Sequence, residues 1–374
     1  MPTKGLKNIF YPDTIAVIGA SNEKDSVGYS LMANMLGHGF KGTVYPVNVK
    51  RESVQGVHAY KSVKDIPRKV DMAVIATPAK TVPAIVRECG EVGVKGVVII
   101  SAGFKEAGEE GLAREREVAE IAAKAGIRII GPNCLGVINP RIKLNASFAI
   151  DMPQEGNIAF ISQSGALCSS IIDWAKDRGI GFSYFVSIGS MLDVDYGDLI
   201  DFFGRDGKTK SIVVYMESVK NAKKFMSAAG GFSKQKPIVI VKSGRYEEGR
   251  KAVVSHTGAI AGSDDVYNAA FKRAGVVRVN EVSDLFDIAE KLAKGPLPSG
   301  PDITVLTNAG GPGVMATDKI IEMKGGLAEL SESSIKKLDE KLPASWSRNN
   351  PVDVLGDADS ERYSAALAEI IKSR

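Results

Sequence analysis

His256 is the histidine of this chain whose surroundings best suit chemistry. The other two histidines, His38 and His58, lie at a predicted helix end (LGHGF) and in a loop after Gly56, where we expect solvated side chains. His256 lies in the small-residue segment 255–263 (SHTGAIAGS), which leaves its imidazole free to move and to accept a group at a ring nitrogen. The sequence therefore predicts a nucleophilic histidine at position 256, with an unreactive loop histidine as the alternative.

Glu217 is the acidic partner that we predict for this histidine. It ends the apolar run 211–217, at the edge of a predicted sheet where functional groups gather. A carboxylate bonded to one imidazole nitrogen selects the tautomer and makes the other nitrogen more nucleophilic. A glutamate at a strand end is also a common surface or capping group, and that interpretation stays open.

Ser164, Gly165 and Ala166 form a predicted phosphate site. The segment FISQSGAL ends a strand and begins a helix, and the free N–H groups of a helix start attract an anion with the help of the helix dipole. The segment resembles a hydrolase nucleophile elbow only loosely, because position 162 is Ser where the G-x-S-x-G motif requires Gly. Cys134, another nucleophile type, has no neighbouring histidine to activate it.

A glycine-containing turn at 17–28 (VIGASNEKDSVG) predicts a second anion site at Gly19, Ala20 and Ser21. A turn of this kind between a strand and a helix brings backbone N–H groups to a phosphate. The long insertion before Gly28 departs from the G-x-G-x-x-G pattern, so a purely structural turn is the alternative.

The end of the second predicted strand indicates which nucleotide would bind. Folds that bind NAD place an Asp or Glu here for the ribose hydroxyls. This chain has Asn48, Lys50 and Arg51 instead, whose positive charges suit a phosphorylated ribose, as in NADP or the 3′-phosphate of coenzyme A; solvated surface charge is the alternative. We expect further ligand contacts at the strand ends Thr77, Pro78 and Ala79, at 101–104, and at Asn133, whose amide suits an acyl or thioester oxygen.

Repeated β-branched runs, each followed by a turn and a segment with helical spacing, predict an α/β protein. The runs are continuously apolar, which is typical of parallel strands covered on both faces. Proline and glycine at 151–156 (DMPQEG) and 295–301 (GPLPSGP) predict domain limits. We expect a doubly wound, Rossmann-like domain over 1–145, a second α/β domain over 151–295, and a third over 301–374 that is small or incomplete. The predicted strands are 14–20, 43–49, 70–76, 94–101, 127–131, 157–162, 182–188, 211–217, 237–243, 276–279 and 303–307.

Composition and charge exclude several classes of protein. The 48 Lys and Arg against 44 Asp and Glu are too balanced for a dedicated nucleic-acid binder. The three cysteines have no metal-ligand spacing and no close pairing, so we expect no metal site and a reducing, cytoplasmic location. The start lacks the apolar run of a signal peptide and no stretch of 18 apolar residues occurs, so we expect no membrane insertion.

Six segments, taken in order, resemble the ADP-forming (NDP-forming) acyl-CoA synthetases, in particular the α subunits of the archaeal ADP-forming acetyl-CoA synthetases, which are related to the succinyl-CoA synthetase α subunit. The resemblance extends over essentially the whole chain. It implies a CoA-binding Rossmann-like domain, a flavodoxin-like ligase domain and a further flavodoxin-like domain. The segments are VIGASNEKDSVG, VYPVN, GPNCLGVIN, FISQSGAL, VSHTGAIAGSD and LTNAGGPGVMATD.

The resemblance also implies a reaction: the reversible conversion of acyl-CoA, ADP and phosphate into acid, CoA and ATP through an acyl phosphate and a phosphohistidine. It implies that His256 is phosphorylated, that Glu217 stabilises it, and that Ser164, Gly165 and Ala166 hold phosphate. The residues that it places against CoA or the acyl group are Gly19, Ala20, Ser21, Val47, Asn48, Lys50, Thr77, Pro78, Ala79 and Asn133.

A partner is implied as well, because the chain has no ATP-grasp region. ADP or ATP, with Mg²⁺, would bind to a β subunit or domain of ATP-grasp fold in an α2β2-type heterotetramer, and the third domain ends early relative to the family's fuller version. Two alternatives remain. An NADP-dependent oxidoreductase leaves His256 and the second α/β domain unexplained. A CoA-sensing or acyltransferase regulatory chain would have no need for the His256 loop.

Overall fold

The computed structural model describes residues 3–249, 263–294 and 300–372. His256 lies outside these ranges. The chain forms two compact units, Met1–Gly295 and Pro296–Arg374, which we describe separately.

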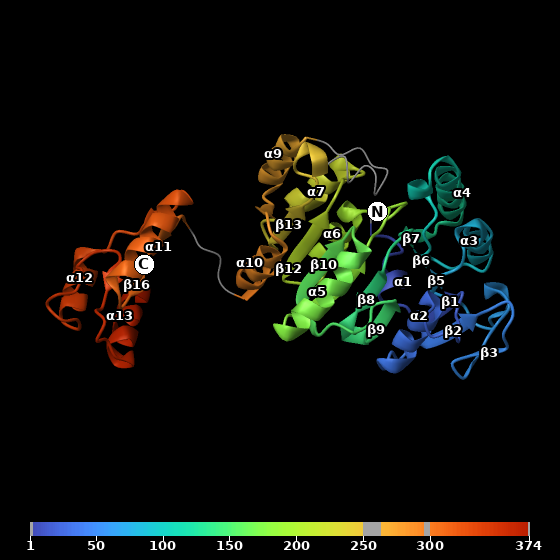
Figure 1. Ribbon diagram of the computed structural model, residues 1–374, viewed down its shortest axis with the longest axis horizontal. Coiled ribbons are helices and arrows are strands. Elements are labelled where there is room, and N and C mark those ends of the chain that lie inside the picture. Colours follow the sequence, from blue (N-terminus) through green and yellow to red (C-terminus); the bar gives the residue numbers. More distant parts are fainter. Residues whose placement is uncertain (1–2, 250–262, 295–299, 373–374) are drawn as a thin grey trace. The chain divides into compact units, whose positions relative to one another are not determined.

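The first sheet of the larger unit has five parallel strands in the order β2-β1-β5-β6-β7 (Figure 1). The chain passes from β1 to β2 on one side and then crosses to β5 on the other, so strand order reverses between β1 and β5. In an open α/β sheet, ligands bind outside the carboxyl ends of the strands at such a point. The strands are β1 (Thr14–Ile18), β2 (Thr43–Val47), β5 (Met72–Ile75), β6 (Gly96–Ile99) and β7 (Arg128–Ile130).

The continuous apolar runs of this sheet are explained by helices on both faces. In β1, Ile15 and Val17 pack in one core with the short helix α1 and with α2, while Ala16 and Ile18 pack in another core with α3 and α4. The predicted two-sided burial is therefore confirmed. The helices are α1 (Lys7–Phe10), α2 (Val27–Gly37), α3 (Val82–Glu91) and α4 (Glu109–Ala125); a small hairpin of β3 (Ser53–Val54) and β4 (Val57–His58) follows β2.

The second sheet has seven strands in the order β14-β13-β12-β10-β11-β8-β9. Strands β10 to β14 are mutually parallel, with α5 and α10 on one face and α6, α7 and α9 on the other. This is the predicted second α/β layer structure. Its elements are β10 (Glu155–Ser162), α5 (Gly165–Asp177), β11 (Phe182–Ser187), α6 (Tyr196–Arg205), β12 (Ser211–Met216), α7 (Ala222–Phe232), β13 (Ile238–Lys242), α9 (Asp264–Ala274), β14 (Val277–Val279) and α10 (Val282–Lys294).

Strands β8 (Gly136–Asn139) and β9 (Leu144–Ser147) form an antiparallel hairpin that the sequence did not predict. Strand β8 lies before the expected limit of the first domain near residue 145, yet it pairs with β11 of the second sheet. The buried Asn34 amide on α2 donates to the carbonyls of Ser147 and Ala149 at 2.8 and 2.7 Å. The hairpin thereby ties the two sheets together, and one hydrophobic core extends across both.

Over residues 300–372, the smaller unit contains two short parallel strand pairs and three helices. Strand β15 (Asp302–Ile303) pairs with β17 (Gly326–Leu327), and β16 (Leu306–Thr307) pairs with β18 (Val352–Asp353). The helices are α11 (Gly310–Glu322), α12 (Glu332–Asp339) and α13 (Ser360–Lys372). Its core gathers around Leu338, Trp346 and Val352. In the part of the chain that the structure describes, no helix has the length and apolar character needed to cross a membrane.

Candidate active site

A cavity of about 460 Å³ lies at the carboxyl ends of β1, β2 and β5, where strand order reverses. We call it the β1–β5 cavity. Lys61, Ser62, Thr81 and Glu88 contribute to its wall and were not predicted from the sequence. Six of the predicted CoA-contacting residues line it: Gly19, Val47, Asn48, Lys50, Thr77 and Pro78.

Gly19 makes the turn below this cavity possible. It has φ of +94°, and a Cβ at this position would lie 2.6 Å from the carbonyl oxygen of Ala76. Gly28 at the start of α2 is equally restricted, because its Cβ would lie 1.9 Å from the carbonyl oxygen of Gly19. The two glycines thus let α2 begin directly against the end of β1, which is the close approach that a phosphate-binding turn requires.

Asn48 shapes the loop after β2. Its Oδ1 accepts hydrogen bonds from the N–H groups of Lys50 and Arg51 at 2.8 and 2.9 Å, and its Nδ2 donates to the carbonyl of Ala20 at 2.8 Å. These contacts hold the Lys50 backbone at the cavity wall. Ala20, Ser21 and Ala79 are not among the residues that line the cavity, and their predicted contacts with CoA stay predictions.

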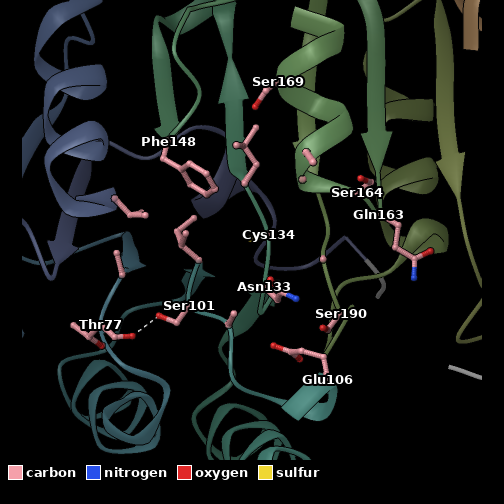
Figure 2. Close-up of a pocket in the computed structure, with 18 residues that line it drawn as sticks. Thr77, Ser101, Glu106, Asn133, Cys134, Phe148, Gln163, Ser164, Ser169 and Ser190 are labelled. Atoms are coloured by element: carbon pink, nitrogen blue, oxygen red, sulfur yellow. Dashed lines mark hydrogen bonds between the residues drawn. The ribbon is translucent and has the colours of Figure 1, made fainter. Parts of the chain in front are cut away.

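A second cavity, of about 590 Å³, lies between the carboxyl edges of the two sheets (Figure 2). We call it the inter-sheet cavity. The predicted residues Thr77, Asn133, Ser164, Gly165 and Ala166 all line it. Thr77 lines both cavities, and its carbonyl accepts a 2.5 Å hydrogen bond from the Ser101 hydroxyl. The two cavities therefore adjoin at the end of β5.

The start of α5 supplies the anion-attracting end of the inter-sheet cavity. Ser164 is the N-cap: its Oγ accepts from the N–H of Leu167 at 3.3 Å, and its own N–H donates to Ser162 Oγ at 3.0 Å. Gly165 and Ala166 form the first turn, whose N–H groups have no carbonyl partner within the helix. These groups and the helix dipole favour a phosphate at this position.

Gln163 holds Glu217 in place. Its buried Oε1 accepts hydrogen bonds from the Tyr196 hydroxyl and from the N–H groups of Glu217 and Ser218, each at 3.0 Å. Burial raises the pKa of Tyr196 well above its usual range, so the phenol stays protonated and donates. Glu217 is itself buried and follows β12 directly. Its pairing with His256 stays a prediction, because that histidine lies outside the described residues.

Glu106 is a residue of the inter-sheet cavity that sequence reasoning missed. Its Oε1 accepts hydrogen bonds from the N–H groups of Gly103 and Phe104 at 2.7 and 3.2 Å. Its Oε2 is buried and has no hydrogen-bond partner among the described residues. Figure 2 shows it in the group of lining side chains that includes Asn133 and Ser190.

Other lining residues were missed for different reasons. Ser190 follows β11, and the strand-end rule that selected Thr77 could have selected it too. Phe148 enters through the β8–β9 hairpin, whose pairing no local pattern indicated. Two lysine amines fix the Ser190 loop: Lys105 donates to the Ser190 carbonyl at 3.0 Å, and Lys220 donates to the next two carbonyls. Burial lowers the pKa of Lys220.

Cys134 lines the same cavity without the properties of a nucleophile. Its Sγ donates to the carbonyl of Ile99 at 3.3 Å, and burial raises the pKa of the thiol. A thiol that resists ionisation is a poor nucleophile. In the described ranges, no group of three His, Cys, Asp or Glu side chains is arranged to hold a metal ion.

Comparison with known proteins connects these cavities to a family. Residues 13–140 match the family model described as a CoA binding domain, and residues 155–292 match the succinyl-CoA ligase like flavodoxin domain. The chain is 46% identical over 358 residues to the α subunit of the ADP-forming acetate–CoA ligase II of Pyrococcus furiosus, covering 96% of this chain and 78% of that one. The chain belongs to the family of ADP-forming acetate–CoA ligases. The resemblance predicted from the six segments is confirmed.

Two further members of this family extend the comparison. The ADP-forming acetate–CoA ligase I of Archaeoglobus fulgidus is 45% identical over 362 residues, which cover 97% of this chain and 52% of that protein. The dinucleotide forming acetyl-coenzyme A synthetase 1 of Ca. Korarchaeum cryptofilum, solved with phosphate and ADP, has a TM-score of 0.92 at 39% identity, covering 98% of this chain and 79% of that one. The chain thus spans about half the length of the Archaeoglobus fulgidus ligase and about four-fifths of the Pyrococcus furiosus α subunit. Membership in this family decides against an NADP-dependent oxidoreductase.

Proposed function

We propose that this chain carries out the CoA-dependent half of an ADP-forming acyl-CoA ligase, with acetyl-CoA as the first substrate to test. One observation carries the proposal: Thr77 lines both the cavity at the switch point of the first sheet and the cavity that holds the phosphate-attracting start of α5. The names of the relatives support acetate as the acid.

The β1–β5 cavity would hold the nucleotide end of CoA. Lys50 and Lys61 bring positive charge to its wall, which suits the 3′-phosphate. The pantetheine arm would pass Thr77 and place the thioester in the inter-sheet cavity, where the Asn133 amide is available to the carbonyl oxygen.

The chemistry would proceed in three steps that conserve the phosphoryl group. Phosphate held at the start of α5 attacks the thioester carbonyl, so a C–O bond forms, the C–S bond breaks, and acyl phosphate and CoA result. A nitrogen of His256 then takes the phosphoryl group and releases the acid. Finally ADP takes the phosphoryl group from the histidine and becomes ATP.

Glu217 would orient the imidazole for the second step. A buried carboxylate stabilises the positive charge that develops on the ring as its nitrogen attacks phosphorus. The hydrogen bonds from the backbone N–H groups of Glu217 and Ser218 to Gln163 support this role, because they hold the main chain that carries the carboxylate at the end of β12.

The nucleotide and the partner belong to the proposal as well. We place ADP or ATP, with Mg²⁺, on an ATP-grasp β subunit or domain in an α2β2-type assembly; the α-subunit name of one relative supports a partner. The domain limits at 1–145, 151–295 and 301–374 stay part of this proposal. The three cysteines, all free and buried, support a reducing location, the cytoplasm.

Protein phosphorylation tests this function most directly. The chain with its ATP-grasp partner is incubated with acetyl-CoA and labelled phosphate, without any nucleotide, and protein-bound label is then measured. We expect acid-labile, base-stable label that requires acetyl-CoA and disappears on addition of ADP. Stable CoA binding without any such label would instead support the CoA-sensing alternative.

Calorimetry tests the CoA site separately. We expect CoA to bind more tightly than dephospho-CoA, and NADP to bind weakly. Replacing Lys50 by Ala should remove most of the preference for the 3′-phosphate. Tighter binding of NADP than of CoA would refute the assignment of the β1–β5 cavity.

A further inference from the structure

We propose that Glu106 is the proton acceptor for the CoA thiol when acyl-CoA forms, and the proton donor to the departing thiolate in the reverse direction. The inference rests on the proposed function, and concerns a side chain that neither the sequence motifs nor the CoA and phosphate sites required. Its support is the geometry of the inter-sheet cavity.

The orientation of Glu106 is fixed by its own loop. The N–H groups of Gly103 and Phe104 both donate to Oε1, and Gly103 adopts φ of +102°, a conformation that favours glycine. The Gly103 carbonyl in turn accepts from the Arg114 side chain on α4. The carboxylate is therefore held at the cavity wall, and the geometry does not depend on a ligand.

The second carboxylate oxygen of Glu106 takes no part in holding the loop. Capping the two N–H groups uses only Oε1, and an amide oxygen would serve equally well. Oε2 is nevertheless buried without a hydrogen-bond partner among the described residues. A buried acceptor left unpaired costs stability, and such exceptions concentrate at functional sites. We infer that a ligand group supplies the missing donor.

Charge distinguishes Glu106 from the other lining residues. In the described part of the chain, it is the one lining side chain of the inter-sheet cavity that carries a charge, and this charge is negative although the cavity is built for a phosphate. An acidic side chain does not help to bind an anion, so we infer that Glu106 has a role other than phosphate binding. A carboxylate is a general base, whereas the Ser, Thr, Asn and Gln side chains around it are not.

The reaction needs a base at this place. A free thiol has a pKa of about 8.5, so it is mostly protonated at neutral pH, and the thiolate is the nucleophile. In the proposed step, the S–H proton moves to Glu106 Oε2 as sulfur bonds to the acyl carbon, the C–O bond of the acyl phosphate breaks, and phosphate leaves. The proton is afterwards released to water. In the reverse direction, protonated Glu106 gives the proton to the CoA sulfur as the C–S bond breaks.

The test separates the step that uses CoA from the step that does not. The chain with its ATP-grasp partner converts acetyl phosphate and CoA into acetyl-CoA in one assay, and takes the phosphoryl group from labelled acetyl phosphate in the other. We expect Glu106→Gln to slow the first about 100-fold, within the usual range for general-base catalysis, and to leave the second within twofold. Glu110→Gln, on an exposed neighbouring residue, is the matched control and should change neither.

The pH profile distinguishes a base from a merely positioning group. In Glu106→Gln the rate of acetyl-CoA formation should rise about tenfold per pH unit from pH 6 to 8, following the thiolate fraction, while the natural chain changes less. Glu106→Asp, which keeps the carboxylate, should retain more activity than the Gln variant. The proposal is overturned if Glu106→Gln keeps acetyl-CoA formation within threefold, slows both assays equally, or loses CoA binding by calorimetry. Failure of both assays in the natural chain would refute the proposed function itself.

Discussion

Replacing Gln163 by Leu should destabilise the larger unit and disturb the site at the end of β12. The Gln163 Oε1 accepts from Tyr196 and from the N–H groups of Glu217 and Ser218, and all four residues are buried. Leucine fills a similar volume but offers no acceptor. The variant therefore isolates the value of one buried hydrogen-bond network.

The size of the destabilisation depends on which hydrogen-bond donors lose their acceptor in Gln163→Leu. The Tyr196 hydroxyl keeps a second acceptor, the Tyr215 carbonyl at 3.0 Å, so its loss is small. In Gln163→Leu the N–H groups of Glu217 and Ser218 lose this acceptor, and each buried donor left unpaired costs about 1–3 kcal/mol. We expect the free energy of unfolding to fall by about 2–6 kcal/mol.

Urea denaturation measures this loss, with Gln154→Leu as the matched control. Gln154 is exposed, and substitutions at such positions usually change stability by no more than about 0.5 kcal/mol. Labelling from acetyl-CoA and phosphate should also fall in Gln163→Leu, because the main chain that carries Glu217 is no longer held. A loss of stability below about 1 kcal/mol, with normal labelling, would refute the role given to this side chain.

Four other perturbations test the remaining assignments. His256→Ala should abolish ATP formation and leave CoA affinity nearly unchanged, because the predicted CoA contacts belong to the first predicted domain and His256 to the second. Glu217→Gln should slow phosphorylation about 100-fold. Gly19→Ala should weaken CoA binding at least tenfold by calorimetry, because its Cβ would meet a backbone carbonyl at 2.6 Å. In the smaller unit, the hydrogen bond from the Trp346 indole N–H lowers the pKa of Asp339. The ionised carboxylate therefore stabilises the folded state above its ordinary pKa of about 3.9, and this stability should be lost as the pH falls through the lower pKa of the folded state. Trp346 fluorescence should report the loss as acid unfolding.

Each perturbation has a control within the chain. His38→Ala and His58→Ala should be nearly silent for ATP formation, and turnover that survives His256→Ala would contradict the phosphohistidine. Gly39 also has positive φ but open space around its Cβ position, so Gly39→Ala separates backbone strain from the clash at the CoA site. Asp339→Asn should show a weaker dependence of stability on acid than the natural chain, and an unchanged dependence would refute the pKa argument.

The sequence by itself predicted which edges of the fold hold the candidate sites. Continuous apolar runs require burial on both faces, which is typical of parallel sheets. The carboxyl ends of parallel strands meet at one edge of the sheet, so Gly19, Thr77 and Ser164 could be placed at such edges from the sequence alone. Local patterns were sufficient because a turn, an N-cap and a strand end are decided by a few neighbouring residues. The same local order in six segments was sufficient to predict the family.

Only the tertiary structure decided what these edges enclose. The β8–β9 hairpin joins the two sheets through contacts between residues more than 100 positions apart, such as Asn34 with Ser147. Thr77 lines two cavities, and Glu106 lines the inter-sheet cavity with one carboxylate oxygen that has no hydrogen-bond partner among the described residues. Both facts depend on where backbone segments far apart in the sequence approach one another. No periodicity or motif records such approaches, since they depend on the packing of whole layers and not on the order of adjacent residues.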